Sequence, residues 1–502
     1  MQDVANVDVL IAGAGPVGLF LANECARRGL DWRLVEARSS QSVYSKALAI
    51  FPRTLEILDM AGLVGPFMEV ANRVTSVAVV AHGRTLAHMP FAPQESPYPL
   101  IAMVPQNVTE QLLAEQLKRR GGVVEYNTAL VSAVQHDDHV RATLEHDGRR
   151  ADVTARFVVG CDGAHSVVRR LVGVDFVGSQ YETHILLADV RLKNPPKDAL
   201  FAKTSAAGIV LMVPFGDGWF RAIAWDRLRE QAPMDEPVTE DEIRGAFQRV
   251  AGDDLGMAEM RWSSRFLSER KQARRYRVDR VFLAGDAAHV HSPLGGQGMN
   301  TGIGDAVNLG WKLAEAVRGE RAGPGRQERS DPGKISRLLD SYQAERHPVG
   351  TRVLRLTDGF NKLVLGTSAV RRAFRRVAIT AILALPPGRR ILGGLLSGIG
   401  IRYDRPRGAH RLVGARMADV DCQPHRLFEL LRSGGFVLLT KAAIDAPMPG
   451  VVAGVHDDPK LPAAVLVRPD GYVAWASDAT PDAAALQAAI DQWTLGTDAS
   501  RV

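Results

Sequence analysis

Cysteine is scarce in this chain of 502 residues. The three cysteines, Cys25, Cys161 and Cys422, lie far apart in the sequence. Three separated cysteines are too few for a disulfide framework or for a zinc site with cysteine ligands. We therefore expect no resident metal ion. A reducing cytoplasm is the expected compartment.

Long hydrophobic runs are also absent. The most apolar stretch, Val377 to Leu385, is followed by two prolines and falls well short of the roughly 20 residues that span a bilayer. The first residues, Met1 to Asn6, lack the basic region of a signal peptide. We expect no stable insertion into a membrane.

Charge of one sign is not concentrated anywhere. Lysine and arginine number 62 and aspartate and glutamate 56, which leaves a net charge of +6 spread along the chain. No basic run is interleaved with aromatic residues, and no zinc-finger or RNA-binding signature is present, so nucleic acid is not an expected partner. The hydrophobic content of 46% is ordinary for a globular protein. The length predicts two or three domains.

The first motif that is present is Gly13-Ala14-Gly15-Pro16-Val17-Gly18. It follows a strand expected over residues 7–12 and opens a helix expected over residues 16–28. Glycines at this spacing permit a tight turn and a close approach of pyrophosphate, which the helix N-terminus then binds. Glu36 ends the next expected strand, where an acceptor for ribose hydroxyls belongs. The pattern predicts a dinucleotide site and fits FAD and NAD equally.

Two later segments favour FAD. A strand expected over residues 280–283 is followed closely by Gly285-Asp286. A glycine-rich stretch ending in Gly298-Met299-Asn300 opens a helix expected over residues 298–317. An aspartate at a strand end can accept bonds from a polyol, and a helix start can present N–H groups to an anionic ring. Asp162-Gly163 is a further strand end between them. A ligand that touches both ends of the chain is long, as FAD is.

With these motifs the chain resembles the FAD-dependent aromatic hydroxylases, which are class A flavoprotein monooxygenases of the p-hydroxybenzoate and phenol hydroxylase superfamily. It looks most like the bacterial branch that acts on aromatic polyketides. The resemblance covers nearly the whole chain. It is carried by residues 13–18, 161–169, 285–308, 339–350 and 465–475.

The resemblance implies an α/β fold with α+β lobes. A Rossmann-like FAD-binding domain would take residues 1–73, 105–175 and 270–400. An antiparallel-sheet substrate domain would take residues 74–104 and 176–269. A thioredoxin-like domain over residues 401–502 would follow. This last domain has no Cys-x-x-Cys, so we expect no redox-active thiol there.

The resemblance also implies roles for individual residues. Gly13, Gly15 and Gly18 would hold the FAD pyrophosphate, and Glu36 the adenosine ribose. Asp286 would bind the ribityl chain, and Asp162 would serve FAD and the nicotinamide nucleotide. Pro293 would lie beside the flavin face without acting as acid or base. Further expected flavin contacts are Pro16, Val17, Arg53, Gln106, Gly285, Gly296, Gly298, Met299 and Asn300.

One position departs from the family pattern. Lys46 stands where the family commonly has an arginine near the pyrophosphate. The charge is kept, but the bidentate fork of the guanidinium is lost.

The activity implied by the resemblance is hydroxylation of a phenolic or aromatic polyketide substrate. NADPH or NADH would reduce FAD, and molecular oxygen would form a flavin C4a-hydroperoxide that transfers one oxygen atom. The alternatives are a Baeyer–Villiger oxygenation by the same peroxide, a flavin oxidase or dehydrogenase, and a flavin-containing binding protein. Either a monomer or a homodimer fits the sequence.

The substrate pocket is less defined by the sequence. Aromatic and sulfur-containing side chains of the second lobe could line a cavity that accepts an aromatic ring. For each of them, a place in the hydrophobic core is the alternative. The residues concerned are Met212, Phe215, Trp219, Phe220 and Trp225, and the candidate bases for a phenol are His184, His289 and His291.

Overall fold

The structure is a computed structural model of the whole chain. It describes residues 5–42, 45, 47–81, 84–90, 95–196, 201–292, 295–321, 331–365, 393–443 and 450–495. Our predictions for Lys46, for Pro293 and for the apolar run 377–385 lie outside these residues, and so does the side chain of Phe215.

The largest element is an eight-stranded sheet with the strand order β17-β18-β11-β1-β2-β8, to which β10 and β9 add. Its strands are β1 (Ala5–Ala12), β2 (Trp32–Val35), β8 (Val124–Glu125), β9 (Thr128–Gln135), β10 (Val140–His146), β11 (Arg149–Gly160), β17 (Arg277–Val278) and β18 (Val281–Leu283). The strands β2, β1, β11 and β18 run parallel. This sheet is the expected dinucleotide-binding core.

The hydrophobic pattern explains this sheet. Val9, Leu10 and Ile11 of β1 are all fully buried, as expected for a parallel strand covered on both faces. Helix α1 (Pro16–Arg27) packs against α4 (Gln106–Arg119) and α7 (Gln297–Arg321). It ends where Gly29 adopts a φ of +70°, as the sequence predicts.

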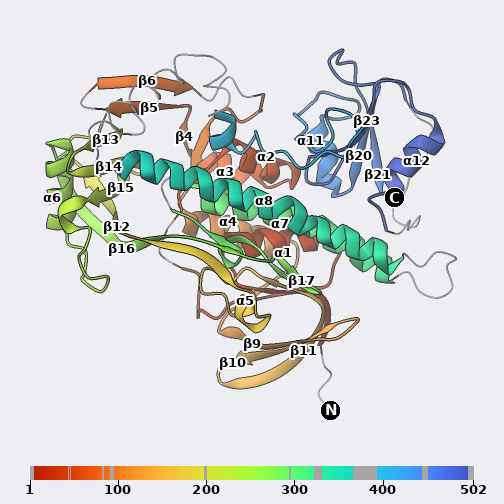
Figure 1. Cartoon of the computed structure of the whole chain (residues 1–502), viewed down its shortest axis with the longest axis horizontal. Coiled ribbons are helices and arrows are strands. Elements are labelled where there is room, and N and C mark those ends of the chain that lie inside the picture. Colours follow the sequence, from red (N-terminus) through yellow and green to blue (C-terminus); the bar gives the residue numbers. More distant parts are fainter. Residues whose placement is uncertain are drawn as a thin grey trace.

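The second lobe is a six-stranded sheet in the order β13-β14-β15-β12-β16-β19. Its strands are β12 (Phe176–Leu192), β13 (Phe201–Ser205), β14 (Gly208–Gly216), β15 (Trp219–Asp226), β16 (Met257–Ala273) and β19 (His289–Val290). All its pairings are antiparallel. Helix α6 (Glu240–Ala251) packs against it (Figure 1). Because β19 follows Gly285-Asp286 directly, the two lobes meet at that motif.

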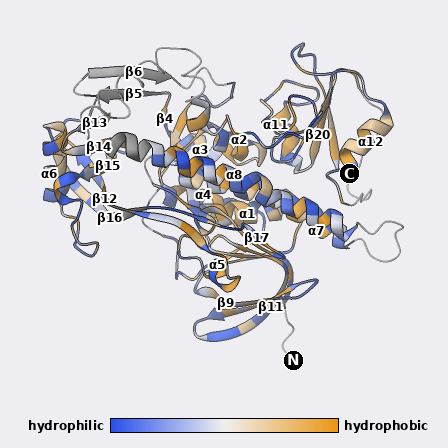
Figure 2. Cartoon of the chain, in the orientation of Figure 1, coloured by the Kyte–Doolittle hydropathy of each residue, from blue (hydrophilic) through white to orange (hydrophobic). Residues whose placement is uncertain are grey.

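Smaller elements connect the lobes. A three-stranded sheet is formed by β3 (Ala49–Ile50), β7 (Ile101–Met103) and β4 (Asn72–Val74). A hairpin is formed by β5 (Ser76–Ala81) and β6 (Arg84–Pro90). The helices are α2 (Pro52–Met60), α3 (Val64–Val70), α5 (Val167–Leu171) and the long α8 (Pro332–Leu365), which crosses the molecule (Figure 1). Hydrophilic and hydrophobic patches alternate along α8 (Figure 2), as on a helix that buries one face.

The C-terminal module, which we define as residues 401–495, contains a four-stranded sheet in the order β21-β20-β22-β23. Its elements are β20 (Phe436–Thr440), β21 (Val451–Val455), β22 (Ala464–Val467), β23 (Val473–Ser477), α11 (Leu427–Leu430) and α12 (Ala483–Asp491). Strands β22 and β23 form an antiparallel hairpin, as the turn residues Pro469-Asp470-Gly471 between them indicate. Phe428 and Val465 belong to the same buried cluster as the dinucleotide-binding sheet, so the module is packed onto that domain.

No helix in the described part of the chain is long and apolar enough to cross a bilayer.

Candidate functional site

Four strands of the large sheet end side by side. Ala12 is aligned with Val35 on one side and with Gly160 on the other, and Gly160 is aligned with Leu283. Because these strands are parallel, the segments that follow them leave at one edge of the sheet, where ligands of such folds bind. The register therefore brings together the motifs at 13–18, 36, 161–163 and 284–286.

The glycine loop has room for a phosphate at one position. A Cβ atom on Gly18 would lie 1.9 Å from the Gly13 carbonyl oxygen, and one on Gly13 would lie 2.5 Å from the Cys161 carbonyl oxygen. A Cβ atom on Gly15 would meet nothing within 4 Å. Gly15 is also the N-cap of α1, with no side chain capping the helix. The open space thus lies at a helix end suited to an anion.

Val17 holds two distant segments against this loop. Its side chain would be 2.9 Å from a Cβ on Gly285 and 2.5 Å from a Cβ on Gly302. Only glycine at both positions allows this contact, which seats the Gly285-Asp286 turn and the first part of α7 on the start of α1. The Asp286 side chain is exposed, and its Oδ1 lies 3.9 Å from a Cβ built on Gly298.

Glu36 is a buried acceptor at the same edge. Its Oε2 accepts a bond of 2.8 Å from the Ala14 amide, and its Oε1 accepts one of 3.0 Å from the Arg38 amide. Burial alone would raise the pKa of Glu36, but the hydrogen bonds from Arg38 and Ala14 lower it below its ordinary value. The group is therefore a carboxylate at neutral pH, as an acceptor for ribose hydroxyls must be.

The first turn of α4 adds unsatisfied polar atoms near Glu36. Gln106 accepts from the Ala47 amide at 3.1 Å and donates to Glu110 Oε1 at 2.9 Å. The other carboxyl oxygen of Glu110 and the Thr109 hydroxyl are buried and have no hydrogen-bond partner in the described structure. Buried polar atoms normally have partners, so these fit a bound polar ligand.

Asp162 and Asn300 act first within the protein. Asp162 Oδ2 accepts from the amides of Val167 and Val168 at 2.7 and 3.0 Å and so caps α5, while its Oδ1 is buried without a partner in the described structure. Asn300 at the start of α7 accepts from the Phe51 amide and donates to the Ala49 carbonyl, both at 2.9 Å. Asn300 thereby fixes the 49–51 segment beside α7, and Met299 next to it is buried.

Arg53 is oriented toward the C-terminal module. Its guanidinium donates to Glu56 at 3.1 Å and to the Asp470 carbonyl at 2.6 Å, and it lies 4.9 Å from the centre of the Tyr472 ring. The structure thus supplies protein partners for this side chain. Its contact with FAD stays a prediction.

The candidate bases differ in setting. His289 is fully buried and its Nε2 lies 2.7 Å from Asp305, so it serves the turn after Gly285-Asp286. His291 lies beside Gly298, and burial lowers its pKa to about 3, with His289 adding to the effect. His184 belongs to the second lobe, where burial and then Arg265 lower its pKa.

In the substrate lobe, the side chains of β14 alternate between two faces of the sheet. One face packs in the hydrophobic core, and the other is available for a substrate site. Met212 is fully buried in the cluster against α6, so the substrate role considered for it is wrong and the core alternative holds. Its neighbours Leu211 and Val213 point to the opposite face, since successive side chains of a strand alternate. Trp225 is paired with Ile209 on that opposite face.

That face meets the dinucleotide-binding domain at an apolar seam that the sequence did not reveal. We define the seam as Val213 and Leu211 with Leu48, Ala49, Phe51, Val74, Ile101 and Met103. The alternation in β14 is the signal that could have found the first two residues. The seam adjoins the start of α7, because Asn300 binds the backbone of Ala49 and Phe51.

The donor set fits a flavin dinucleotide. The edge offers a helix N-terminus with open space at Gly15, a carboxylate at Glu36 and an exposed carboxylate at Asp286. In the part of the chain described, no three side chains of histidine, cysteine, aspartate or glutamate are arranged to hold a metal ion.

Comparison with known proteins identifies this arrangement. The FAD binding domain family matches residues 6–357, and the C-terminal aromatic-ring hydroxylase family matches residues 410–496. Rifampicin monooxygenase from Streptomyces venezuelae is 37% identical over 480 residues, which are 94% of this chain and 96% of that protein. The uncharacterized aromatic compound monooxygenase YhjG from Bacillus subtilis is 35% identical over 97% of this chain and 98% of its own length.

A solved structure agrees with these matches. That of OxyS anhydrotetracycline hydroxylase from Streptomyces rimosus superimposes with a TM-score of 0.83 at 32% identity, covering 98% of this chain and all of that one. Fold and site thus define a flavoprotein monooxygenase. The chain belongs to the FAD-dependent aromatic hydroxylases, and it uses FAD, a reduced nicotinamide and molecular oxygen. The resemblance inferred from the motifs is confirmed.

Proposed function

We propose that this enzyme hydroxylates a phenolic, multi-ring aromatic substrate of the polyketide kind. The observation that carries the proposal is the register of four parallel strands that gathers the FAD motifs at one edge. An apolar seam lies beside that edge. The names of relatives support the substrate class, since they include a rifampicin monooxygenase and an anhydrotetracycline monooxygenase.

We assign the cofactor contacts as follows. The α1 N-terminus at Gly15 binds the pyrophosphate, Glu36 binds the adenosine ribose, and Asp286 binds the ribityl chain. The polar atoms of Gln106 and Glu110 face the adenosine side. For Lys46 and Pro293 we keep the predicted roles, a charge near the pyrophosphate and a neighbour of the flavin face.

The substrate is proposed to lie along the seam. Its apolar side chains come from three sources, the 48–51 segment, the small sheet and β14. An apolar wall that spans two lobes suits a flat multi-ring ligand, and small-molecule sites often lie between domains. Leu211, Val213 and Trp225 are the residues of the substrate lobe that we assign to this wall.

The chain's own contribution to chemistry is electrostatic and steric. Bound FAD supplies the two-electron chemistry and the activation of oxygen. The start of α7 directs backbone N–H groups and the positive end of a 25-residue helix toward the flavin edge, which stabilises a negative charge there. The seam keeps water away, so that reduced nicotinamide is not consumed without product.

The remaining parts of the proposal concern organisation. We keep the division into residues 1–73 with 105–175 and 270–400, residues 74–104 with 176–269, and residues 401–502. We propose a cytoplasmic enzyme that acts on a small aromatic molecule without a nucleic-acid partner, as a monomer or a homodimer.

The test uses the FAD-loaded full chain with anhydrotetracycline, rifampicin and a simple phenol. NADPH and NADH consumption and product mass are measured together. Hydroxylation predicts that at least one multi-ring compound accelerates nicotinamide oxidation and gains one oxygen atom with its rings intact. A ring-expanded product would favour the Baeyer–Villiger alternative. If the nicotinamide is consumed with every compound and no product gains an oxygen atom, the oxidase alternative is favoured.

A further inference from the structure

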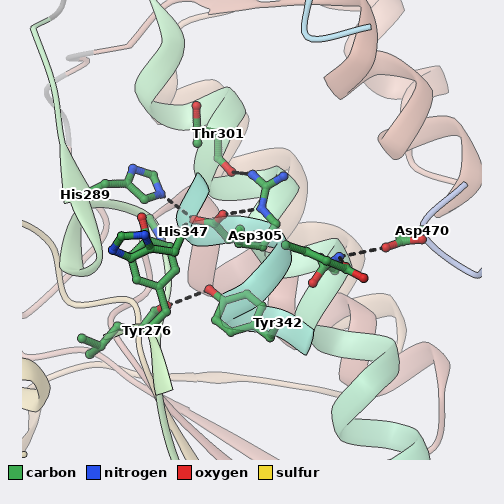
Figure 3. Close-up of polar contacts among 12 residues, drawn as sticks. Tyr276, His289, Thr301, Asp305, Tyr342, His347 and Asp470 are labelled. Carbon is green, nitrogen blue, oxygen red and sulfur yellow. Dashed lines mark hydrogen bonds and ion pairs between the residues drawn. The ribbon is translucent and has the colours of Figure 1, made fainter. Parts of the chain in front are cut away.

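A single buried carboxylate joins the two segments to which we assign the flavin. Asp305 on α7 is fully buried (Figure 3). Its Oδ2 accepts from the Gly285 amide at 3.1 Å and lies 2.7 Å from His289 Nε2. Its Oδ1 accepts from Arg346 Nε at 2.7 Å. One side of this carboxylate thus faces the Gly285-Asp286 turn, and the other side faces α8.

Arg346 neutralises the charge of Asp305 and also binds the backbone of α7. Its guanidinium, which is also buried, donates to the Thr301 carbonyl at 3.0 Å. A Cβ on Gly304 would lie 2.9 Å from Arg346 Nη2, so the guanidinium lies close against the helix. Burial would raise the pKa of Asp305, but Arg346 and then His289 lower it below its ordinary value. The group is a carboxylate that accepts from three donors.

These hydrogen bonds matter because the Gly285-Asp286 turn and the start of α7 are separated in the chain. No short stretch of backbone fixes the distance between them. Gly285 begins the turn that carries Asp286, and Thr301 follows Asn300 at the start of α7. Residues 286–300 lie between them, so the relative position of turn and helix depends on non-covalent contacts. Asp305 reaches both, through its own helix and through Gly285.

The C-terminal module contacts the same group of side chains. The Tyr403 hydroxyl lies 3.4 Å from Arg346 Nη1. Asp470 Oδ2 accepts from Asn308 Nδ2 at 3.0 Å (Figure 3). Asn308 lies about one turn beyond Asp305 on α7. The module therefore contacts α7 through Asn308 and contacts the Arg346 side chain that pairs with Asp305.

We propose that Asp305 is a positioning residue for the flavin. It sets the distance between the Gly285-Asp286 turn and the start of α7, and Arg346 and the C-terminal module hold it in place. The inference rests on the proposed cofactor contacts of Asp286 and α7 but not on the proposed substrate.

A matched control is available in the chain. Asp59 on α2 is equally buried, is bound by the Tyr98 hydroxyl at 2.7 Å, and pairs with Arg426 and Arg432 of the C-terminal module. It links α2 to the C-terminal module, and none of its described partners belongs to a flavin motif. Asp59→Asn therefore measures what loss of a buried carboxylate does to stability alone.

The experiment compares full-length wild type, Asp305→Asn and Asp59→Asn. FAD affinity of the apoprotein, the visible spectrum of the bound flavin, its reduction potential and the thermal midpoint are measured without any aromatic substrate. We expect Asp305→Asn to raise the FAD dissociation constant by about tenfold or more and to shift the spectrum or potential. We expect Asp59→Asn to lower the thermal midpoint while the dissociation constant stays within about twofold.

Two results would overturn the inference. One is an Asp305→Asn protein with the wild-type affinity, spectrum and potential, and the other is an equal flavin effect from Asp59→Asn. If Asp305→Asn does not fold, His289→Phe decides, because it removes one of the three donors and leaves Arg346 in place. That variant should weaken FAD binding by about threefold or more, and an unchanged affinity would contradict the proposal. A failed search for substrates would leave all these readouts intact.

Discussion

The Arg53 guanidinium on α2 donates a hydrogen bond of 2.6 Å to the carbonyl oxygen of Asp470, 417 positions later in the chain. Glu56, which pairs with Arg53, also pairs with Arg416 of the C-terminal module at 2.7 Å. All these groups are buried or nearly so. Buried ion pairs and a buried hydrogen bond thus hold the module against the FAD-binding domain. These buried contacts give the module, which has no Cys-x-x-Cys, a structural role in the enzyme.

Loss of the Asp470 carboxylate should destabilise the whole protein. Asp470 is fully buried and pairs with Arg468, whose charge is also buried. Asp470→Ala removes one partner and leaves that cation less compensated, which typically costs about 3–5 kcal/mol. Urea unfolding measures the loss, with the exposed Asp478→Ala as control. A change below about 1 kcal/mol for Asp470→Ala would contradict the account of the module.

Two glycines of the first loop should respond differently to alanine. Gly18→Ala forces a Cβ to 1.9 Å from the Gly13 carbonyl, so we expect a poorly folded protein. Gly15→Ala meets no protein atom within 4 Å and keeps the fold. Its methyl group enters the space assigned to the pyrophosphate, and FAD affinity should fall by about tenfold or more.

Thermal unfolding of the apoproteins and FAD titration separate these outcomes. A Gly15→Ala protein that folds and binds FAD as tightly as the wild type would show that the pyrophosphate lies elsewhere.

Substitutions at two neighbouring residues of β14 should have different effects, one on stability and the other on substrate affinity. Met212→Ala empties a site in the core against α6 and should cost about 2–5 kcal/mol, with KM for the substrate unchanged. Val213→Ala removes part of the seam and should raise KM by severalfold, at a smaller cost in stability. Steady-state kinetics and urea unfolding of both variants provide the check. The reverse pattern would place the substrate on the α6 side.

Much of this site could be predicted because local rules determine it. A strand, a glycine turn and a helix are encoded within about 25 residues, and parallel strands necessarily bring their ends to one edge. The motifs at 13–18, 36, 162 and 286 meet for this reason, although about 270 positions separate the first from the last.

What the sequence could not predict depends on long-range packing. Nothing near Arg53 indicates that Asp470 will bind it, and nothing near Asp305 indicates that Arg346 of another helix supplies its counter-charge. The alternation of side chains in β14 shows that Met212 and Val213 point to opposite faces of the sheet. Assigning Met212 to the core also requires knowing that α6 covers its face. The length of α8 is a further example, because the helix spans Pro332–Leu365 and continues through Pro348, where sequence rules favour a break.

Acid should destabilise the protein through Glu345. Burial would raise the pKa of this carboxyl, but Arg468 and Lys312, at 2.6 and 2.8 Å, hold it well below its ordinary value. The unfolded chain therefore takes up a proton at this site before the folded chain does. The stability that the carboxylate contributes is complete above about pH 4.5 and is lost as pH falls toward the folded pKa.

Urea midpoints between pH 3 and 6 test this linkage. Wild type should lose stability more steeply below pH 4.5 than Glu345→Gln, by up to about 1.4 kcal/mol per pH unit. Glu115→Gln, at an exposed position of α4, should follow the wild-type curve. Parallel curves for wild type and Glu345→Gln would contradict the pKa shift.

The most direct test of the central claim is isotope labelling of the product. The FAD-loaded enzyme is given reduced nicotinamide, a multi-ring phenol that accelerates its oxidation, and ¹⁸O₂ in ordinary water, and the product is analysed by mass spectrometry. The account predicts one atom of ¹⁸O in an aromatic product whose rings are intact. Absence of ¹⁸O from the product, with all of it recovered as hydrogen peroxide, would contradict the assignment as an aromatic hydroxylase.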